Sequence, residues 1–184
     1  MPDLAGSKVA YLGFCGAIDS ASVTKICQMI NAAVNNAFDE IYLNLNSPGG
    51  YMGDGIYLYN HLRALPIPLT IHNTGSVSSI AATVFVAGTH RFCTSNAIFM
   101  IHPVTIGTNG GMAATALKTA MQAALHDEQR TEAILRDRTS IPDNIFSQRL
   151  TEDVYLSSTQ ALEFGLVHEI RDFTLPPGNQ LFQI

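Results

Sequence analysis

The chain has 184 residues, 47% of them hydrophobic, enough for one domain that buries on the order of 70% of the surface of its unfolded chain. Its net charge is −5 and no basic run is interleaved with aromatic residues, so nucleic acid is not an expected partner. No apolar run approaches the roughly 18 residues of a membrane span, and the start MPDLAGSK does not resemble a signal peptide, so no membrane association is expected.

Cysteine usage and motif spacing also limit the cofactors to be expected. Cys15, Cys27 and Cys93 are odd in number and widely spaced, which predicts neither a disulfide framework nor a metal clip and favours a cytoplasmic location. No His, Cys or carboxylate cluster has metal-ligand spacing. The glycine-rich GTNGG at residues 107–111 lacks the Lys-Ser/Thr of a phosphate-binding loop. We therefore expect no metal and no cofactor.

The first part of the chain alternates between the hydrophobic patterns of strands and helices. Asp19 or Ser20 is a suitable cap for the first helix, and Pro66 and Pro68 stop the second. The sequence EIYLNLN alternates apolar and polar residues as a strand does, and runs directly into SPGG. The predicted elements are strands at 8–14, 40–46 and 69–73 and helices at 19–38 and 51–65.

The alternation continues to the end of the chain. An apolar helix follows the serines at 78 and 79 and ends near Gly88, and a capping-box pattern begins at Ser157. The other predicted elements are strands within 90–94, 97–102, 154–156 and 166–170, a long Ala-rich helix at 112–138, a short helix after Pro142, and a loose tail from Phe173. Alternating strands and helices predict a single α/β domain.

The long helix carries an apolar stripe formed by Leu117, Met121 and Leu125. Taken alone, a stripe of this kind predicts that the helix packs within its own protomer.

The segment NTGSVSSIAATVFVAG places two hydroxyls at the start of a buried helix. The first backbone N–H groups of a helix have no partner within it, so a developing oxyanion would be stabilised there and an adjacent serine could attack a carbonyl. Ser78 or Ser79 could equally be an ordinary helix cap. The segment does not match the G-x-S-x-G elbow of α/β-hydrolases.

Three further positions each allow a structural and a chemical interpretation. SPGG is either a turn or a loop whose glycines leave N–H groups bare at the end of a strand. His102 is either a structural histidine or a general base, because an imidazole can accept and donate a proton at physiological pH. Asp153 is either a solvated turn carboxylate or the group that orients the histidine.

These segments together resemble the ClpP family of serine peptidases. YLNLNSPGG, GSVSSIAATVFVAGTHRF, AIFMIHP and EDVYLSSTQALEFGLV are similar to successive blocks of that family, in the same order. Gly50 and Ser79 are 29 positions apart, and His102 and Asp153 are 51 apart. The likeness runs from about residue 9 to residue 170.

The resemblance implies a Ser-His-Asp triad of Ser79, His102 and Asp153. It implies that the backbone N–H groups of Gly50 and Ile80 form the oxyanion hole. An extended peptide substrate would lie between two strand-like segments, one formed by Tyr51 and Met52 and the other by Thr105, Ile106 and Gly107. The implied activity is endopeptidase cleavage of unfolded proteins or peptides.

The resemblance also implies a ClpP/crotonase-like fold with repeated β-β-α units and a protruding handle helix. The single domain, 1–184, would consist of a head at about 8–104 and 139–172 and a handle at about 105–138. The family's handle associates subunits and rings, so we expect a homo-oligomeric ring, as a heptamer or stacked rings. A Clp ATPase unfoldase is a family partner, but only seven residues precede the first predicted strand, fewer than in the family's axial segment.

Some residues depart from the family pattern. Ile80-Ala81 stands where Met-Gly is common, and His102 is followed by Pro103 where Gln-Pro is usual, so the substrate groove is expected to differ.

Two other functions compete with the peptidase. A crotonase-type acyl-CoA hydratase or isomerase would usually place acidic residues at its site, and a non-catalytic ring subunit would be favoured by loss of a triad residue.

Overall fold

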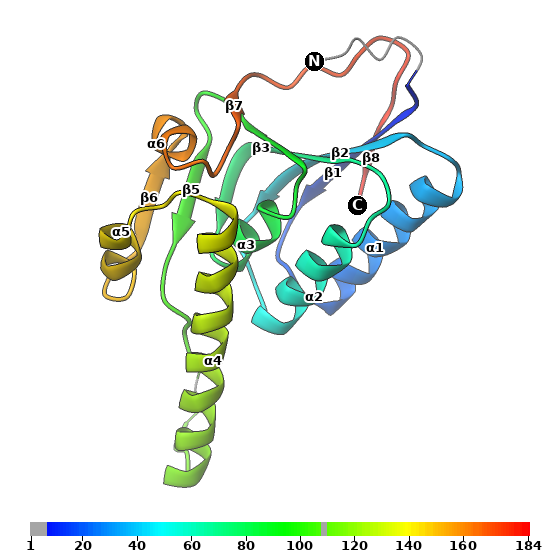
Figure 1. The fold of residues 1–184 in the computed structure, drawn as a ribbon. Helices are drawn as coiled ribbons and strands as arrows, with labels where there is room; N and C mark the ends of the chain where they lie inside the picture. Colours follow the sequence, from blue (N-terminus) through cyan, green and yellow to red (C-terminus); the bar gives the residue numbers. More distant parts are fainter. Residues whose placement is uncertain (1–6, 108–109) are drawn as a thin grey trace.

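The computed structural model describes residues 7–107 and 110–184 and shows a mixed α/β fold, as predicted (Figure 1). The sheet has eight strands. Six of them are ordered β6-β5-β3-β2-β1-β8, and the other two form a branch in which β4 pairs with β3 and β7 pairs with β4. The predicted N-terminal segment before residue 7 and two residues of GTNGG lie outside the described residues. No helix in the described part of the chain is long and apolar enough to cross a membrane.

The first two strands and the first two helices form the N-terminal part of the fold, which carries the SPGG loop of the site. Strand β1 (Val9–Cys15) pairs in parallel with β2 (Glu40–Ser47), and α1 (Ser20–Asn35) and α2 (Met52–Arg63) connect them to each other and to β3. Asp19 caps α1 through a capping box with Ser22, which confirms one of the two predicted caps. Burial of one face of α1 against the sheet holds these elements together.

Strand β3 (Leu69–Ser78) is longer than the predicted 69–73. It includes Ser78, the first of the two candidate serines, and ends directly before Ser79. Its first half pairs with β4 (His90–Cys93) and its second half with β5 (Ile98–Ile101). Two partly buried side-chain amides hold the second half of β3 in place: Asn73 Nδ2 donates to the Ile98 carbonyl at 2.9 Å, and the Ser76 N–H donates to Asn46 Oδ1 at 2.9 Å. Hydrophobicity alone could not show this because four of the five added residues, 74–78, are Thr, Gly or Ser and only Val77 is apolar.

The remaining elements follow the predicted order; most are shorter than predicted, and the strand predicted at 154–156 is one residue longer. Helix α3 (Ile80–Phe85) is fully buried and follows β3 directly. The C-terminal elements are α4 (Ala114–Arg138), α5 (Asp143–Gln148), β6 (Val154–Ser157), α6 (Ser158–Glu163) and β7 (Glu169–Ile170). The predicted capping box at the start of α6 joins Ser157 and Gln160. Strand β6 pairs antiparallel with β5.

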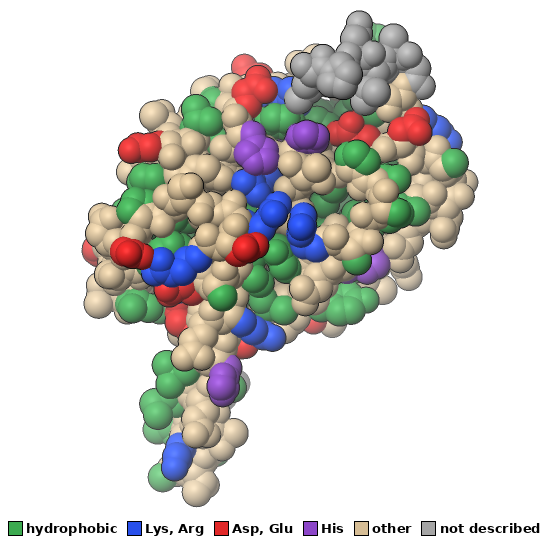
Figure 2. Space-filling view, in the orientation of Figure 1, with side chains coloured by type: hydrophobic (Ala, Val, Ile, Leu, Met, Phe, Trp, Pro, Cys, Tyr) green, Lys and Arg blue, Asp and Glu red, His purple; other side chains and the backbone are tan. Residues whose placement is uncertain are grey.

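Helix α4 projects away from the body of the molecule (Figure 1). Only Thr131 and Leu135, both near its C-terminal end, are buried. Leu117, Met121 and Leu125 are each at least 50% exposed, and hydrophobic side chains follow one side of the projection (Figure 2). The alternative in which this stripe packs within its own protomer is therefore wrong, since the described part of the chain leaves it uncovered.

The tail from Phe173 is ordered, so its prediction as loose was wrong. Phe173 packs on an aromatic cluster of Tyr11, Tyr42 and His72, with ring centroids 5.6–6.5 Å apart. Strand β8 (Leu181–Gln183) then pairs in parallel with β1 and covers the edge that β1 would otherwise expose. The tail covers aromatic side chains of β1 and β2. The sequence of the tail itself has no local pattern that predicts this packing.

Buried His72 makes the free energy of unfolding dependent on pH. Its Nδ1 lies 2.7 Å from the Tyr42 hydroxyl, and burial lowers its pKa from 6.5 to about 4. Below pH 6.5 the unfolded chain binds a proton that the folded chain does not, so stability falls as the pH drops toward 4. We expect this group to contribute a loss of ~2 kcal/mol between pH 7.5 and pH 5. Urea unfolding of wild type and His72→Gln at both pH values measures it, and equal losses in the two proteins would contradict the assignment.

Candidate active site

Strand register brings the three predicted triad residues to one end of the sheet. The parallel pairing of β3 with β5 places Ser78 beside Met100, so Ser79 and His102 leave the sheet as neighbours. The antiparallel pairing of β5 with β6 ends at Ile101 and Val154. The next positions outward on these two strands are His102 and Asp153, which therefore face each other although 51 residues separate them.

Ser79 has a backbone conformation that side chains rarely adopt. Its φ is 58° and its ψ is −133°, in the sharp turn between β3 and α3. A residue other than glycine costs about 1–3 kcal/mol in such a region. Hydrogen bonds hold the turn, because the Ser79 N–H donates to the Met100 carbonyl at 2.8 Å and the Ala82 N–H donates to the Ser79 carbonyl at 2.9 Å. The strained turn thus projects the hydroxyl away from the helix.

The Ser79 hydroxyl is not a helix cap. It makes no side-chain capping bond to α3, and its Oγ instead lies 2.8 Å from Nε2 of His102. The hydroxyl of Ser78 lies on β3, 3.4 Å from the Ser76 hydroxyl. The capping interpretation is therefore wrong for both serines. A hydroxyl hydrogen bonded to a neutral imidazole is the arrangement in which a serine can be deprotonated as it attacks.

Asp153 lies close to His102 without a direct hydrogen bond. The distance from Nδ1 of His102 to Oδ1 of Asp153 is 3.9 Å, too long for such a bond but within the range of an ion pair. The Asp153 side chain is 54% exposed, whereas that of His102 is 21% exposed. The carboxylate can stabilise an imidazolium through its charge, weakened by solvent screening.

The SPGG loop packs directly against Ser79 and Ile18. Gly49 has a φ of 95°, and a Cβ there would come within 2.6 Å of the Ser79 Cβ. A Cβ on Gly50 would come within 2.0 Å of the Ile18 carbonyl oxygen. The loop is held by bonds on either side of Gly50: the Ile18 N–H donates to the Gly49 carbonyl at 2.8 Å, and the Tyr51 N–H donates to the Ile18 carbonyl at 2.9 Å.

Two backbone donors remain free beside the serine. In a parallel bridge the residue between the two bonded groups directs its own N–H to the opposite side, so the Gly50 N–H points away from Ile18. The Ile80 N–H is the first of α3 and has no acceptor within the helix. Neither group donates a hydrogen bond within the described residues. Both residues line one cavity with Ser79 and His102.

Two of the five predicted peptide-binding residues line this cavity, and the other three lie outside it. Met52 and Thr105 line it, whereas Tyr51, Ile106 and Gly107 are exposed outside it. Tyr51 has an extended backbone and Met52 begins α2, and the described residues from 102 to 107 form no strand. The predicted strand-like character is therefore limited to the extended backbone of Tyr51, and neither segment forms a strand in the described part of the chain.

A charged group that the sequence did not indicate borders the same cavity. Arg149, which is 3% exposed, lines it and pairs with Glu128 and Glu132 of α4. Burial raises the pKa of Glu132, but hydrogen bonds from Arg136 and Arg149 outweigh this and lower it overall. These residues have ordinary helical spacing in the sequence, and only the packing of α4 on α5 brings them together.

No group of three or more His, Cys, Asp or Glu side chains in residues 7–107 and 110–184 could hold a metal ion.

Comparison with known proteins supports the resemblance seen in the sequence. A family model described as Clp protease matches residues 8–173, which includes every residue of the site. The chain belongs to the Clp protease family. It is 25% identical over 175 residues to the ATP-dependent Clp protease proteolytic subunit 2 of Pseudomonas aeruginosa, a match that covers 92% of this chain and 86% of the relative.

A second member of the Clp protease family gives a similar result. The chain is 26% identical over 157 residues to the ATP-dependent Clp protease proteolytic subunit 3 of Rhizobium etli, covering 84% of this chain and 80% of that protein. Both matches extend across the head and the projecting helix. Membership of the Clp protease family identifies the chain as a relative of peptide-hydrolysing enzymes and leaves the roles of its individual residues to be argued from their geometry.

Proposed function

We propose that this chain is a serine endopeptidase in which Ser79 is the nucleophile, His102 the general base and Asp153 the carboxylate that stabilises the imidazolium. The observation that carries the proposal is the 2.8 Å contact between Ser79 Oγ and His102 Nε2 at a strained turn. Ser79 attacks the peptide carbonyl as His102 accepts its proton. His102 then gives the proton to the leaving amine, and water attacks the acyl-enzyme to release the second product.

The free N–H groups of Gly50 and Ile80 suit the role of an oxyanion hole. During the attack the carbonyl oxygen becomes negatively charged, and donors fixed before the reaction stabilise it without reorganisation. The two donors come from a glycine loop and a helix start that border the same cavity as Ser79. The rigid bridge between Gly50 and Ile18 fixes one of them, and the turn at Ser79 fixes the other.

The proposed substrate is an extended peptide from an unfolded protein. The peptide would add as a strand between Tyr51, whose backbone is extended, with Met52 at the start of α2 beside it, and the segment of Thr105, Ile106 and Gly107, which forms neither helix nor strand. Apolar side chains of Met52, Ile80 and Leu135 line the cavity beside Ser79.

The projecting α4 supports the proposal that the chain works as a homo-oligomeric ring with α4 as its handle. Its three apolar residues at 117, 121 and 125 are spaced for one helical face and stay at least 50% exposed. Clp protease relatives are proteolytic subunits of ATP-dependent enzymes, so any ATP hydrolysis would belong to a partner ATPase. Analytical ultracentrifugation of the purified chain measures the assembly.

A fluorophosphonate probe tests the proposed nucleophile. Such probes form a stable phosphorus–oxygen bond, with loss of fluoride, only to serines activated by a neighbouring base. We expect one adduct per chain, and peptide mapping by mass spectrometry should locate it on Ser79. The nearby Ser76 and Ser78 are internal controls, because their hydroxyls lie next to each other and not next to an imidazole. Absence of an adduct on folded, assembled protein would contradict the proposal and favour a non-catalytic ring subunit.

A further inference from the structure

One carboxylate of the projecting helix contacts the chain segment that follows His102. The backbone N–H of Val104 donates a hydrogen bond to Oε2 of Glu128 at 2.7 Å. Val104 is only two residues beyond His102, and Pro103 between them has no N–H to donate. This is therefore the first backbone donor after His102 at which the segment can be held, and it is held by a residue of α4.

The other oxygen of the same carboxylate contacts the segment that leads to Asp153. Oε1 of Glu128 pairs with Nη1 of Arg149, and Nη2 of Arg149 pairs with Oε2 of Glu132 at 2.8 Å. Arg149 lies four residues before Asp153 and is 3% exposed, whereas the Glu128 side chain is 15% exposed. A buried guanidinium of this kind depends on its carboxylates, because an unpaired buried charge is costly.

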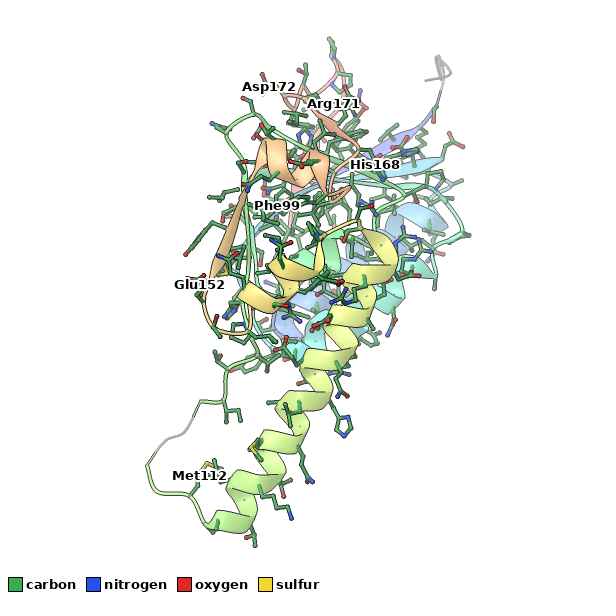
Figure 3. The ribbon with its side chains drawn as sticks, turned by 60° about the vertical axis from the view of Figure 1, so that its left-hand side comes forward. Phe99, Met112, Glu152, His168, Arg171 and Asp172 are labelled. Atoms are coloured by element: carbon green, nitrogen blue, oxygen red, sulfur yellow. The ribbon has the colours of Figure 1, made fainter. Side chains whose placement is uncertain are left out.

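Glu128 thus connects the two segments that carry the base and the carboxylate of the site. His102 and Asp153 have no direct hydrogen bond to each other, and Asp153 is more than half exposed. Their separation is set instead by the β5–β6 pairing on one side and by contacts beyond the ends of those strands on the other. Figure 3 shows Glu152, next to Asp153, on the loop that precedes β6, at the level of the body-proximal end of α4.

We propose that Glu128 is a positioning residue for the reaction: it fixes the distance between His102 and Asp153 by binding Val104 and Arg149 with its two oxygens. The inference rests on the proposed function and deepens it, because it assigns a role to the base of the handle. Glu132 provides a natural comparison. It also pairs with Arg149 and lies four residues further along α4, but among the described residues it accepts no hydrogen bond from the segment that follows His102.

Loss of Glu128 is expected to affect the rate more than loss of Glu132. Without Glu128 the Val104 N–H loses its acceptor and Arg149 keeps only Glu132, so both segments can shift. Misplacement of a catalytic group by about 1 Å can cost up to about 100-fold in rate. Loss of Glu132 leaves Arg149 paired with Glu128 and leaves Val104 unchanged.

The test compares Glu128→Ala with Glu132→Ala by the rate of fluorophosphonate labelling of Ser79. The probe is small and does not need the extended peptide-binding segments, so its rate reports activation of the serine. We expect labelling to slow about tenfold in Glu128→Ala and less than twofold in Glu132→Ala. Thermal unfolding and sedimentation identify conditions in which both variants are folded and assembled to the same extent.

The outcomes separate this inference from the proposed function. If wild type is not labelled, the proposed function is wrong and the positioning role is wrong with it. If wild type is labelled and the two variants slow equally, or neither slows, the proposed function stands and the positioning role is overturned. Glu128→Gln is a second variant in case Glu128→Ala does not fold. It keeps an acceptor for Val104, and labelling should slow roughly threefold; an unchanged rate would also overturn the inference.

Discussion

Replacement of either Ser79 or His102 by alanine is expected to lower the turnover of peptide hydrolysis by about 10⁴ to 10⁶-fold. The two side chains form one hydrogen-bonded unit with a separation of 2.8 Å, so loss of either removes the activated nucleophile. For the same reason the double variant should be no slower than the slower single variant. Hydrolysis of a fluorogenic peptide by purified, assembled protein measures the effect.

Ser78→Ala is the matched control for these substitutions. It removes a hydroxyl one position away whose hydrogen-bond partner in the described part of the chain is Ser76, so activity should stay within a few-fold of wild type. Asp153→Asn should reduce turnover less than His102→Ala, because the carboxylate is 54% exposed and 3.9 Å from the imidazole. Retention of activity in Ser79→Ala, or its loss in Ser78→Ala, would show that the nucleophile is assigned wrongly.

Replacement of Gly50 by alanine is expected to lower turnover by about 10² to 10³-fold. The new Cβ would lie 2.0 Å from the carbonyl oxygen of Ile18, which is backbone and cannot rotate away. The loop must then move, and the Gly50 N–H moves out of line with the developing oxyanion. The bridge to Ile18 would also be strained, so the midpoint of thermal unfolding should fall. Steady-state kinetics together with thermal unfolding measures both effects.

Gly53→Ala is the control for Gly50→Ala. A Cβ at Gly53 meets no atom within 4 Å, and the residue lies on the exposed side of α2. Alanine there should leave turnover unchanged and raise stability by up to about 1 kcal/mol, because alanine favours a helix. Equal turnover in Gly50→Ala and wild type would exclude Gly50 from the oxyanion hole.

The α/β class and most helices and strands followed from the sequence; the exceptions are β8 and the second half of β3. Local signals were sufficient where one segment determines its own structure: Asp19 caps α1, Ser157 begins the capping box of α6, and Pro66 and Pro68 follow α2. Such features depend on neighbours in the chain and on a repeating apolar pattern. The family was also readable from its successive blocks of sequence, since their order and spacing are properties of the chain alone.

Local signals failed where a contact joins segments that are distant in the sequence. The tail beyond Phe173 has no strong pattern, and only the exposed aromatic face of β1 and β2 gives it a place to pack. Likewise the second half of β3 is small and polar, and β5 and the amides of Asn46 and Asn73 make it a strand.

The sequence by itself determined most of the helices and strands, the family and the residue types of the candidate site. Only the tertiary structure decided which of those residues meet. The bond between Ser79 and His102, the long gap to Asp153 and the bridge made by Glu128 all arise from strand register and from the packing of α4. The physical reason is that distances between side chains are set by pairings across tens to more than a hundred residues, whereas sequence patterns report the balance of burial and exposure within one segment.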